Sequence, residues 1–324
     1  MELKLKPIVI AASVSATMLF GQAVVAADKV VISEFKYASA QGSLYVLKEI
    51  IETKLGLEVE SLPGTNAVFY AGMDRGNGEV DLHAEGWMPN QIALVKEYVE
   101  EKGTVAMSQK SYAATSGFCV PRYFSEEYNV KTISDLARPE IAKLLDSDGD
   151  GMGEIWSGNP AWIATKENSV KIRDYGLELF NVNVQSDGAV YYANLAAAVK
   201  KKAGIAGYCW SPDGVWKQYD VVQLEEPAFA DSCYNFVNPQ SDEKWYENSK
   251  ITCGSAPKGV HILWSKNLET RLPILTAFLA NVELDSETVS GWAYEIGSLK
   301  RDAKEVAHEW IAANEDRVNK WLGL

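Results

Sequence analysis

The stretch KVVISEFKYASAQGSLYVLKEIIETKLGLEVESL, residues 29–62, decides the fold class. Apolar and polar residues alternate over 29–35, and this period of two predicts a strand. From Ser43 to Leu55 the apolar residues recur at helical spacing, with Ser43 as the expected N-cap. Residues 57–62 predict a second strand. Such a strand–helix–strand unit is typical of an α/β fold with a mostly parallel sheet and helices on both faces.

The same alternation continues to residue 102. A helix is expected over 66–75, ending at Gly76. A short strand over 80–84 then leads directly into Glu85-Gly86-Trp87, and a further helix is expected over 92–102. This first series forms one complete α/β unit.

A second series begins near Tyr112. The expected elements are a strand at 117–121, a helical turn at 133–137, helices at 171–180 and 194–202, and strands at 205–210 and 259–265, followed by a largely helical tail over 268–322. The strand at 259–265 can return the chain to the first unit. We therefore expect two lobes with a ligand cleft between them: lobe I from residues 28–112 plus 263–324, and lobe II from residues 113–262.

Residues 1–27 have the features of a cleaved secretory signal peptide. Lys4 and Lys6 precede a short apolar run, and small residues close the segment at Ala26 and Ala27. A membrane anchor would need about 20 apolar residues, which no later stretch approaches. The mature protein is therefore expected to be soluble and periplasmic.

The chain of 324 residues carries a formal net charge of −13. An acidic surface repels polyanions, so nucleic acids and anionic lipids are excluded as partners, and solubility is the simplest reading of the charge. One chain of this length supplies both lobes, so we expect a monomer.

Four cysteines occur in a chain expected to be exported. Cys233 and Cys253 flank a stretch rich in Pro, Asn and Ser, and a disulfide is expected there. It would close a 20-residue loop and stabilise it by roughly 3 kcal/mol. Cys119 and Cys209 lie in apolar, strand-like runs, where buried thiols are the default interpretation and pairing stays open.

Three tryptophan-centred signatures stand out among the ten tryptophans: EGWMPN at 85–90, NPAW at 159–162 and WSPDGVW at 210–216. Trp87 and Trp210 follow the carboxyl ends of expected strands, where open α/β sheets bind ligands. They belong to different lobes, so both can face one cleft. Indole faces attract cations that cannot donate hydrogen bonds, such as trimethylammonium. Core packing is the alternative role for each tryptophan.

These signatures, with Asp146-Ser-Asp-Gly-Asp-Gly, Gly158-Asn-Pro-Ala-Trp162 and Tyr208-Cys-Trp210-Ser-Pro, occur in a familiar order. The chain resembles the glycine betaine/proline betaine substrate-binding proteins of ABC transporters, the family of ProX-type and OpuAC-like receptors. The resemblance covers the whole mature chain and implies the two-lobed periplasmic-binding-protein fold. It also implies that Trp87, Trp162 and Trp210 box the trimethylammonium head, with Trp216 close to them.

The resemblance further implies a site for the ligand's carboxylate at the backbone N–H groups of Ile163 and Ala164. Two departures from the family pattern occur at this end of the site. Gln91 stands where the family has His, and Ser157 and Ala164 stand where it has Cys.

Glu85 adds an acidic group beside the cage, unless it is only a solvated or salt-bridged acid. A carboxylate there would favour a cation without a carboxylate of its own, such as trimethylamine N-oxide or choline. Glycine betaine and dimethylsulfoniopropionate would need their carboxylate held away from Glu85. The ligand is therefore interpreted as a methylated onium osmolyte of unresolved identity.

An acidic loop at 146–154 has the spacing of a Ca²⁺-binding loop. Its candidate ligands are Asp146, Asp148, Asp150, Met152 and Glu154, with Gly151 at the sharp turn. Ser157 replaces the bidentate Glu of the twelfth position, and a solvated acidic turn is the alternative. A structural Ca²⁺ that fixes the loop carrying Trp162 is expected, and no organic cofactor.

The sequence offers little for catalysis. Its three histidines, His83, His261 and His308, fall in no zinc-binding motif, and no nucleophile elbow or phosphate-binding loop is present. We expect a substrate-binding protein that delivers its ligand to an inner-membrane ABC permease and its ATPase. The alternatives are a sensory receptor that presents choline or dimethylsulfoniopropionate, and a secreted hydrolase of choline-type esters.

Overall fold

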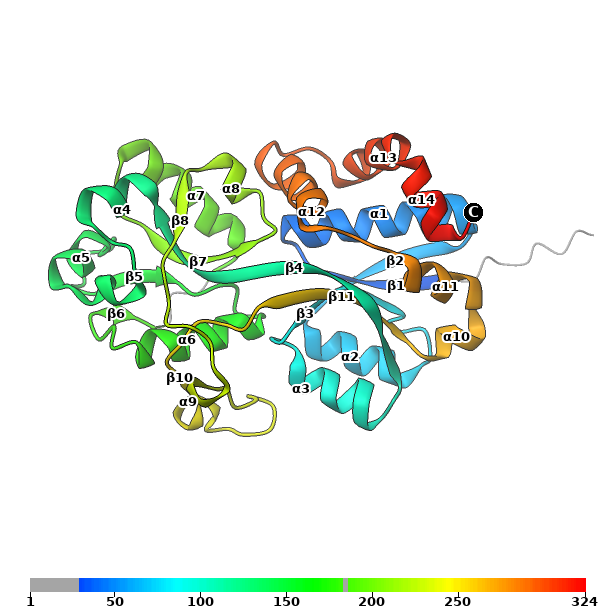
Figure 1. Cartoon of the computed structure of the whole chain (residues 1–324), viewed down its shortest axis with the longest axis horizontal. Coiled ribbons are helices and arrows are strands. Elements are labelled where there is room, and N and C mark those ends of the chain that lie inside the picture. The colour runs from blue at the N-terminus through cyan, green and yellow to red at the C-terminus, as the bar shows by residue number, and fades with distance from the viewer. Residues whose placement is uncertain (1–28, 183–185) are drawn as a thin grey trace, which may run out of the picture.

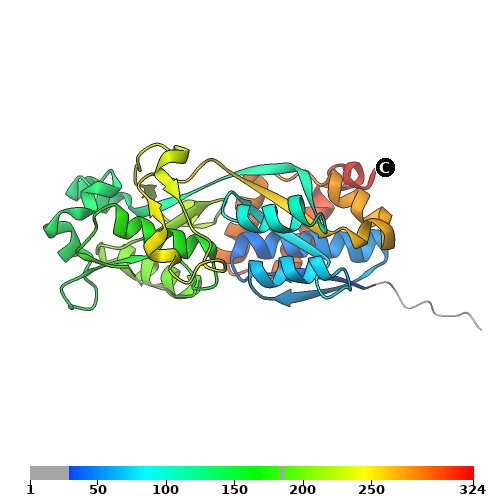
Figure 2. The ribbon, with the colours of Figure 1, turned by 90° about the horizontal axis from the view of Figure 1, so that it is seen from below.

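A computed structural model describes residues 29–182 and 186–324 of the chain. The expected signal peptide lies outside the described residues. The molecule is elongated, with two α/β halves side by side (Figures 1 and 2). None of the helices in the described ranges combines the length and the apolar character needed to span a bilayer.

One mixed sheet runs through both halves, with the strand order β2-β1-β3-β11-β4-β7-β5-β6 and with β8 paired to β4. Its strands are β1 (Lys29–Glu34), β2 (Glu58–Pro63), β3 (Leu82–Met88), β4 (Val105–Pro121), β5 (Gly153–Trp156), β6 (Phe180–Asn181), β7 (Ala206–Ser211), β8 (Val221–Gln223) and β11 (Lys258–Ser265). A separate ribbon pairs β9 (Tyr234–Asn235) with β10 (Lys250–Ile251). The long strand β4 leaves lobe I and β11 returns to it, so the two strands form the connection between the lobes (Figure 1).

Lobe I packs helices on both faces of β2-β1-β3-β11. The helical segments of this lobe are α1 (Ala38–Leu55), α2 (Asn66–Arg75), α3 (Ile92–Leu94), η1 (Val95–Glu101), α10 (Asn267–Arg271), α11 (Pro273–Asn281), α12 (Ser286–Ala293), η4 (Tyr294–Ser298), α13 (Ala303–Ala313) and α14 (Glu315–Leu322). The core on one face joins α1 to the C-terminal helices, and a second core lies under α2 and η1. The helical tail predicted for 268–322 is confirmed.

Lobe II is built around β7, β5 and the second half of β4. Its helical segments are α4 (Arg122–Tyr128), η2 (Ile133–Ala137), α5 (Pro139–Leu144), α6 (Ile163–Asp174), α7 (Gly188–Lys201), α8 (Val215–Gln218), η3 (Asp231–Cys233) and α9 (Trp245–Asn248). Two clusters of buried residues form its core, and the smaller one is rich in Trp and Tyr. This smaller cluster faces the cleft and holds the predicted tryptophans.

Several local expectations were wrong. The sheet is mixed rather than mostly parallel, because β11 and β4 insert antiparallel strands at its centre. Helix α1 begins at Ala38, and Ser43 is not an N-cap but a buried residue inside the helix, where its Oγ donates to Oε1 of Glu85. The Ser43 hydroxyl therefore makes a buried hydrogen bond to another side chain instead of capping the helix.

The helix expected over 171–180 was misplaced. The structure has α6 at Ile163–Asp174, while Phe180 starts strand β6. Strand β3 extends through Glu85-Gly86-Trp87 to Met88, so Trp87 lies inside a strand rather than after it. Trp210 likewise lies inside β7.

Both cysteine pairs form disulfides. Cys233–Cys253 was predicted and is confirmed. Cys119 and Cys209 also pair, so the default of two buried thiols was wrong. The reason is tertiary: the antiparallel register places Cys119 opposite Gly207 and Gly117 opposite Cys209, with Cα atoms of the two cysteines 5.8 Å apart.

Candidate functional site

Three elements carry the predicted tryptophans to one place. Trp87 lies near the end of β3 in lobe I, and Trp210 lies near the end of β7 in lobe II. Trp162 is the N-cap residue of α6, with an extended backbone that precedes the first helical turn. Both lobes therefore contribute to one wall of aromatic side chains.

The three tryptophans line a cavity of about 60 Å³ between the lobes. Its lining residues are Phe35, Tyr37, Asn66, Trp87, Asn90, Gln91, Trp162, Ile163, Ala164, Tyr208 and Trp210. None of these residues carries a formal charge. The direct contacts of a cation in this cavity would be ring faces and dipoles.

The rings meet mostly at right angles. Trp162 and Trp210 have centroids 5.3 Å apart at an interplanar angle of 86°, and Tyr37 meets Trp162 at 5.6 Å and 84°. Behind them Trp156 stacks on Tyr191 at 4.3 Å and 7°. Edge-to-face and stacked packing of this kind holds aromatic rings in fixed orientations. The cage walls are thus supported by a second layer of aromatic residues.

The cavity lining also includes polar groups. Ile163 and Ala164 are the first residues of α6, whose N-terminus carries the positive end of the helix dipole. Gln91 lines the cavity and is oriented by two contacts: its Oε1 accepts from the Tyr70 hydroxyl at 2.9 Å, and its Nε2 donates to the Glu85 carbonyl at 3.3 Å. The N-terminus of α6 and the Gln91 amide together favour a ligand oxygen that is anionic or a strong hydrogen-bond acceptor.

Glu85 lies behind the cage wall and is not among the cavity-lining residues. Its Oε1 accepts from Ser43 and Tyr112 at 3.0 Å each, and its Oε2 accepts from Nε1 of Trp87 at 3.1 Å. Burial raises the pKa of this carboxyl, and the hydrogen bonds from Trp87, Ser43 and Tyr112 oppose the shift. The geometry makes Glu85 a support for the Trp87 indole.

Trp216 and His83 also lie outside the cavity lining. Trp216 donates its Nε1 hydrogen to the carbonyl of Trp210 at 2.7 Å and so braces that residue from behind. His83 is fully buried, with Nδ1 2.7 Å from the Ser33 hydroxyl. Burial lowers the pKa of His83 to about 3, so it is uncharged at neutral pH.

The sequence interpretation missed five lining residues: Phe35, Tyr37, Asn66, Asn90 and Tyr208. Tyr208 and Asn90 stand inside the quoted signatures, so nearness to the tryptophans was a usable signal for them. Tyr37 was missed because the helix was expected to begin at Ser43, which left Tyr37 in an unassigned loop. In the structure Tyr37 precedes α1 and reaches across the cleft to both Trp162 and Trp210.

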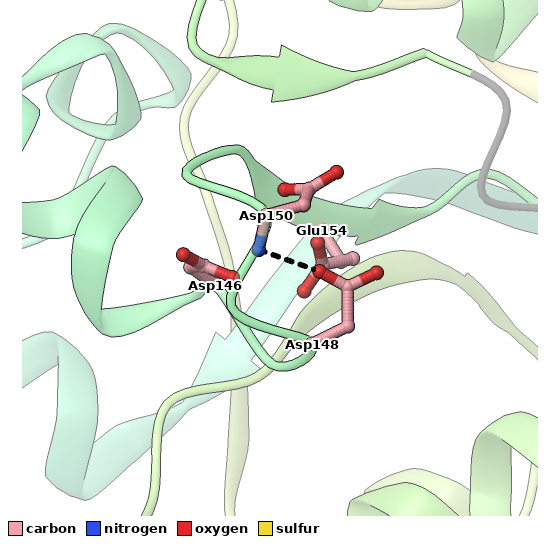
Figure 3. A group of neighbouring side chains, drawn as sticks. All are labelled: Asp146, Asp148, Asp150 and Glu154. Atoms are coloured by element: carbon pink, nitrogen blue, oxygen red, sulfur yellow. Dashed lines mark hydrogen bonds between the residues drawn. The ribbon is translucent and has the colours of Figure 1, made fainter.

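The acidic loop connects α5 to β5 at the outer end of lobe II (Figure 1). Figure 3 shows its four acidic side chains, Asp146, Asp148, Asp150 and Glu154, close to one another. Asp146, Asp148, Asp150 and Glu154 each offer a carboxylate oxygen, and these oxygens lie within 4.8 Å of one another. Backbone N–H groups of the loop already donate to several of them, including Asp150 N to Asp148 at 3.1 Å. Among the described residues, Oε1 of Glu154 is buried without a hydrogen-bond partner.

Comparison with known proteins shows the family of this chain. Residues 28–313 match the family model for the substrate-binding domain of the ABC-type glycine betaine transport system. This chain belongs to that family. Its members are binding proteins of transporters, so at the level of the family the chain is a substrate-binding protein and not an enzyme.

Curated relatives of this glycine betaine family are periplasmic proteins. The glycine betaine-binding periplasmic protein OusX of Dickeya dadantii is 22% identical over 254 residues, covering 76% of this chain and 75% of OusX. The glycine betaine/proline betaine-binding periplasmic protein of Escherichia coli is 21% identical over 253 residues, with the same two coverages.

Solved structures of binding proteins share the fold. Lactococcal OpuAC, closed on glycine betaine, superposes with a TM-score of 0.69 at 20% identity and covers 91% of this chain and 99% of its own. An ABC-transporter choline-binding protein with choline gives 0.70 at 19% identity, with 91% of each chain covered. At these identities the likeness shows the two-lobed fold alone. The predicted family and fold class are thus confirmed.

Proposed function

We propose that this family member captures a methylated onium osmolyte in the Trp87–Trp162–Trp210 cage and delivers it to an ABC permease and its ATPase in the inner membrane. The observation that carries the proposal is the cavity between the lobes, which is lined by aromatic rings together with Gln91 and the first residues of α6. Such a cavity matches a small molecule with a fixed positive charge and a separate oxygen end.

The aromatic rings select the cation. A primary ammonium group has three N–H donors and needs acceptors, which Trp rings supply poorly. A trimethylammonium group has no N–H, so it loses little on leaving water and gains about 0.5–2 kcal/mol from each ring face it meets. Quaternary cations are therefore preferred over ordinary amines.

The polar groups that line the cavity restrict the choice of ligand further. Because Glu85 is held behind Trp87, no carboxylate lines the cavity to repel an anionic ligand group. The N-terminus of α6 at Ile163 and the amide of Gln91 favour a carboxylate or an N-oxide oxygen. We therefore place glycine betaine and trimethylamine N-oxide ahead of choline, whose polar end is a neutral hydroxyl.

Titration calorimetry of the mature protein tests this ranking. The panel is glycine betaine, trimethylamine N-oxide, choline, dimethylsulfoniopropionate and carnitine. Micromolar or tighter binding of one of the two leading compounds is the expected result. In the Glu85→Gln variant the affinity for all five compounds should fall by a similar factor, because Glu85 acts through Trp87. A wild-type protein that binds none of the five contradicts the proposal, and a changed rank order in Glu85→Gln shows that Glu85 acts on the ligand itself rather than only through Trp87.

We propose as well that the acidic loop holds a structural Ca²⁺. The residues fit the ion: four carboxylates converge, one of their oxygens is a buried acceptor without a partner, and the Met152 carbonyl stands at the seventh loop position. The loop runs directly into β5, whose chain continues to Trp162. Bound Ca²⁺ would tie the loop to that strand and stabilise the folded state.

Calcium titration of the melting temperature tests this second proposal. At a hundredfold excess over Kd a folded-state ligand stabilises by about 2.7 kcal/mol. We expect calcium to raise the melting temperature of the wild-type protein and to leave an Asp148→Asn/Asp150→Asn variant unchanged. Equal melting curves for the wild-type protein in calcium and in chelator would show a solvated acidic turn instead.

A further inference from the structure

Asn90 occupies the boundary between the ligand cavity and an outer groove. It lines the cavity, and it also lines a groove of about 400 Å³ that opens on one side of the cleft. This groove lies between α2 and α3 of lobe I and α6 with residues 229–240 of lobe II. Asn66, Trp162 and Ile163 also line both spaces, so Asn90 is one of four residues shared by the cavity and the groove.

Two charged residues fix the orientation of the Asn90 amide. Lys258 Nζ donates to Oδ1 of Asn90 at 2.5 Å, and Nδ2 of Asn90 donates to the Glu167 carboxylate. A lysine ammonium can only donate and an ionised carboxylate can only accept. The oxygen of the amide must therefore face Lys258 and its nitrogen must face Glu167.

The three residues come from both sides of the cleft. Asn90 follows β3 in lobe I, and Glu167 lies on α6 in lobe II. Lys258 is the first residue of β11, where it pairs with Ala114 of β4 in the strands that connect the lobes. The hydrogen bond from Asn90 to Glu167 therefore crosses the cleft and joins lobe I to lobe II.

The surroundings strengthen these bonds. Lys258 and Glu167 are each only 5% exposed. Burial lowers the pKa of Lys258 to about 8 and the Glu167 carboxylate opposes that shift, so the ammonium stays largely charged at pH 7. On the next turn of α6, Lys171 pairs with Glu226 at 2.8 Å, which holds a second buried charge pair beside the first. Shielded, charge-assisted hydrogen bonds are the strong ones.

We infer that Lys258, Asn90 and Glu167 form a latch that holds the lobes closed over the ligand cavity and sets the rate at which ligand leaves. Opening the cleft breaks the Asn90–Glu167 hydrogen bond and exposes both groups to water. The latch therefore stabilises the closed state relative to the open one. This inference rests on the proposed function, because it assigns a role in ligand release to the same cavity. Asn90 is then a positioning residue rather than a ligand contact.

Exchange of donor and acceptor across the cleft tests the latch. Asn90→Asp places two carboxylates against each other, and Glu167→Gln removes the charge from the acceptor. In the double variant the introduced amide can donate to the introduced carboxylate, and Lys258 still meets an oxygen. Stopped-flow tryptophan fluorescence measures the dissociation rate of whichever panel compound the wild-type protein binds, and calorimetry gives Kd.

We expect Asn90→Asp to speed dissociation by about tenfold or more and the double variant to return to within about threefold of the wild-type rate. Asn238→Asp is the matched control, since it adds the same charge to the same groove away from the latch. Melting temperatures confirm that each variant folds.

Two failures can be told apart. If the wild-type protein binds none of the compounds, the proposed function is wrong. If it binds but the effects of the two single variants simply add in the double variant, the latch is wrong and Asn90 acts on the ligand or on folding alone.

Discussion

At the residue scale, the cage depends on how each tryptophan is held. The Trp87 indole is anchored by Glu85, Trp210 is braced through its carbonyl by Trp216, and Trp162 is wedged against Tyr37 and Trp210. These contacts fix ring orientation before a ligand arrives. Pre-ordered walls matter because a ligand then loses no binding energy in arranging them.

Replacement of each cage tryptophan should weaken ligand binding. We expect Trp87→Ala, Trp162→Ala and Trp210→Ala each to raise Kd at least tenfold, which is about 1.4 kcal/mol, because each removes a ring face from the cation. Trp245→Ala is the control, since Trp245 lies on α9 outside the cavity. Calorimetry measures the effect, and near-normal affinity in all three variants would show that these rings pack the core only.

Asp213 is a second residue with a measurable consequence. It is buried in lobe II, where its Oδ1 accepts from Val215 N at 2.8 Å. Burial raises its pKa to about 6, against the partial compensation of hydrogen bonds from Val215 and Tyr192. Its folded-state pKa therefore lies above the unfolded value.

The sign of the resulting pH dependence follows from proton linkage. Between about pH 4 and pH 6 the folded state binds the Asp213 proton more tightly, so this residue's contribution to stability falls as pH rises. Relative to the wild-type protein, Asp213→Asn should gain stability across this window by up to about 3 kcal/mol and then stay level. Urea unfolding at several pH values measures the difference, and a pH-independent difference would contradict the raised pKa.

At the element scale, α6 shows why the helix predicted over 171–180 was misplaced. The helix buries Glu167, Asn168, Ser169 and Lys171, which are polar residues that normally mark an exposed face. Helical periodicity is recognised from apolar residues on the buried side. Because polar residues with partners such as Glu226 and Asn90 are buried beside Val170 and Ile172, the apolar periodicity of this helix is weak in the sequence.

The two disulfides should differ in their effect on stability. Cys119–Cys209 joins β4 to β7 and closes a separation of 90 residues, while Cys233–Cys253 closes 20. Chain entropy gives about 4.6 kcal/mol for the longer loop and about 3 kcal/mol for the shorter. We expect the Cys119→Ala/Cys209→Ala variant to lose more free energy of unfolding than Cys233→Ala/Cys253→Ala.

Denaturant unfolding without reductant measures both losses. A thiol assay on the unfolded, unreduced wild-type protein provides the control and should detect no free thiol. Two free thiols per chain, or a smaller loss from the Cys119 pair, would contradict the bridge between β4 and β7.

At the scale of the whole molecule, function depends on the two lobes meeting. The cavity takes residues from both lobes, and two strands, β4 and β11, connect them (Figure 1). A ligand that touches both lobes stabilises the closed arrangement over an open one.

We therefore expect ligand to compact the protein. Small-angle scattering should show a smaller radius of gyration at saturating ligand than without it, and Trp162→Ala should need more ligand for the same change. Scattering profiles that are identical with and without a ligand bound by calorimetry would mean that the lobes do not move.

The sequence by itself determined the α/β class, the two-lobed organisation and the family, and it indicated that Trp87, Trp162 and Trp210 share one cleft. These follow from local information: hydrophobic periodicity, and short motifs whose residues are neighbours in the chain. It also placed the Cys233–Cys253 bridge, because those cysteines flank a single loop.

Only the tertiary structure decided which distant residues meet. It paired Cys119 with Cys209 through strand register, moved Glu85 behind the cage through contacts with α1 and β4, and joined Asn90 to Glu167 across the cleft. The physical reason is shared by all three. A polar or sulfur atom gains its role from the partner it reaches, and that partner lies far away in the sequence, where no local pattern records it.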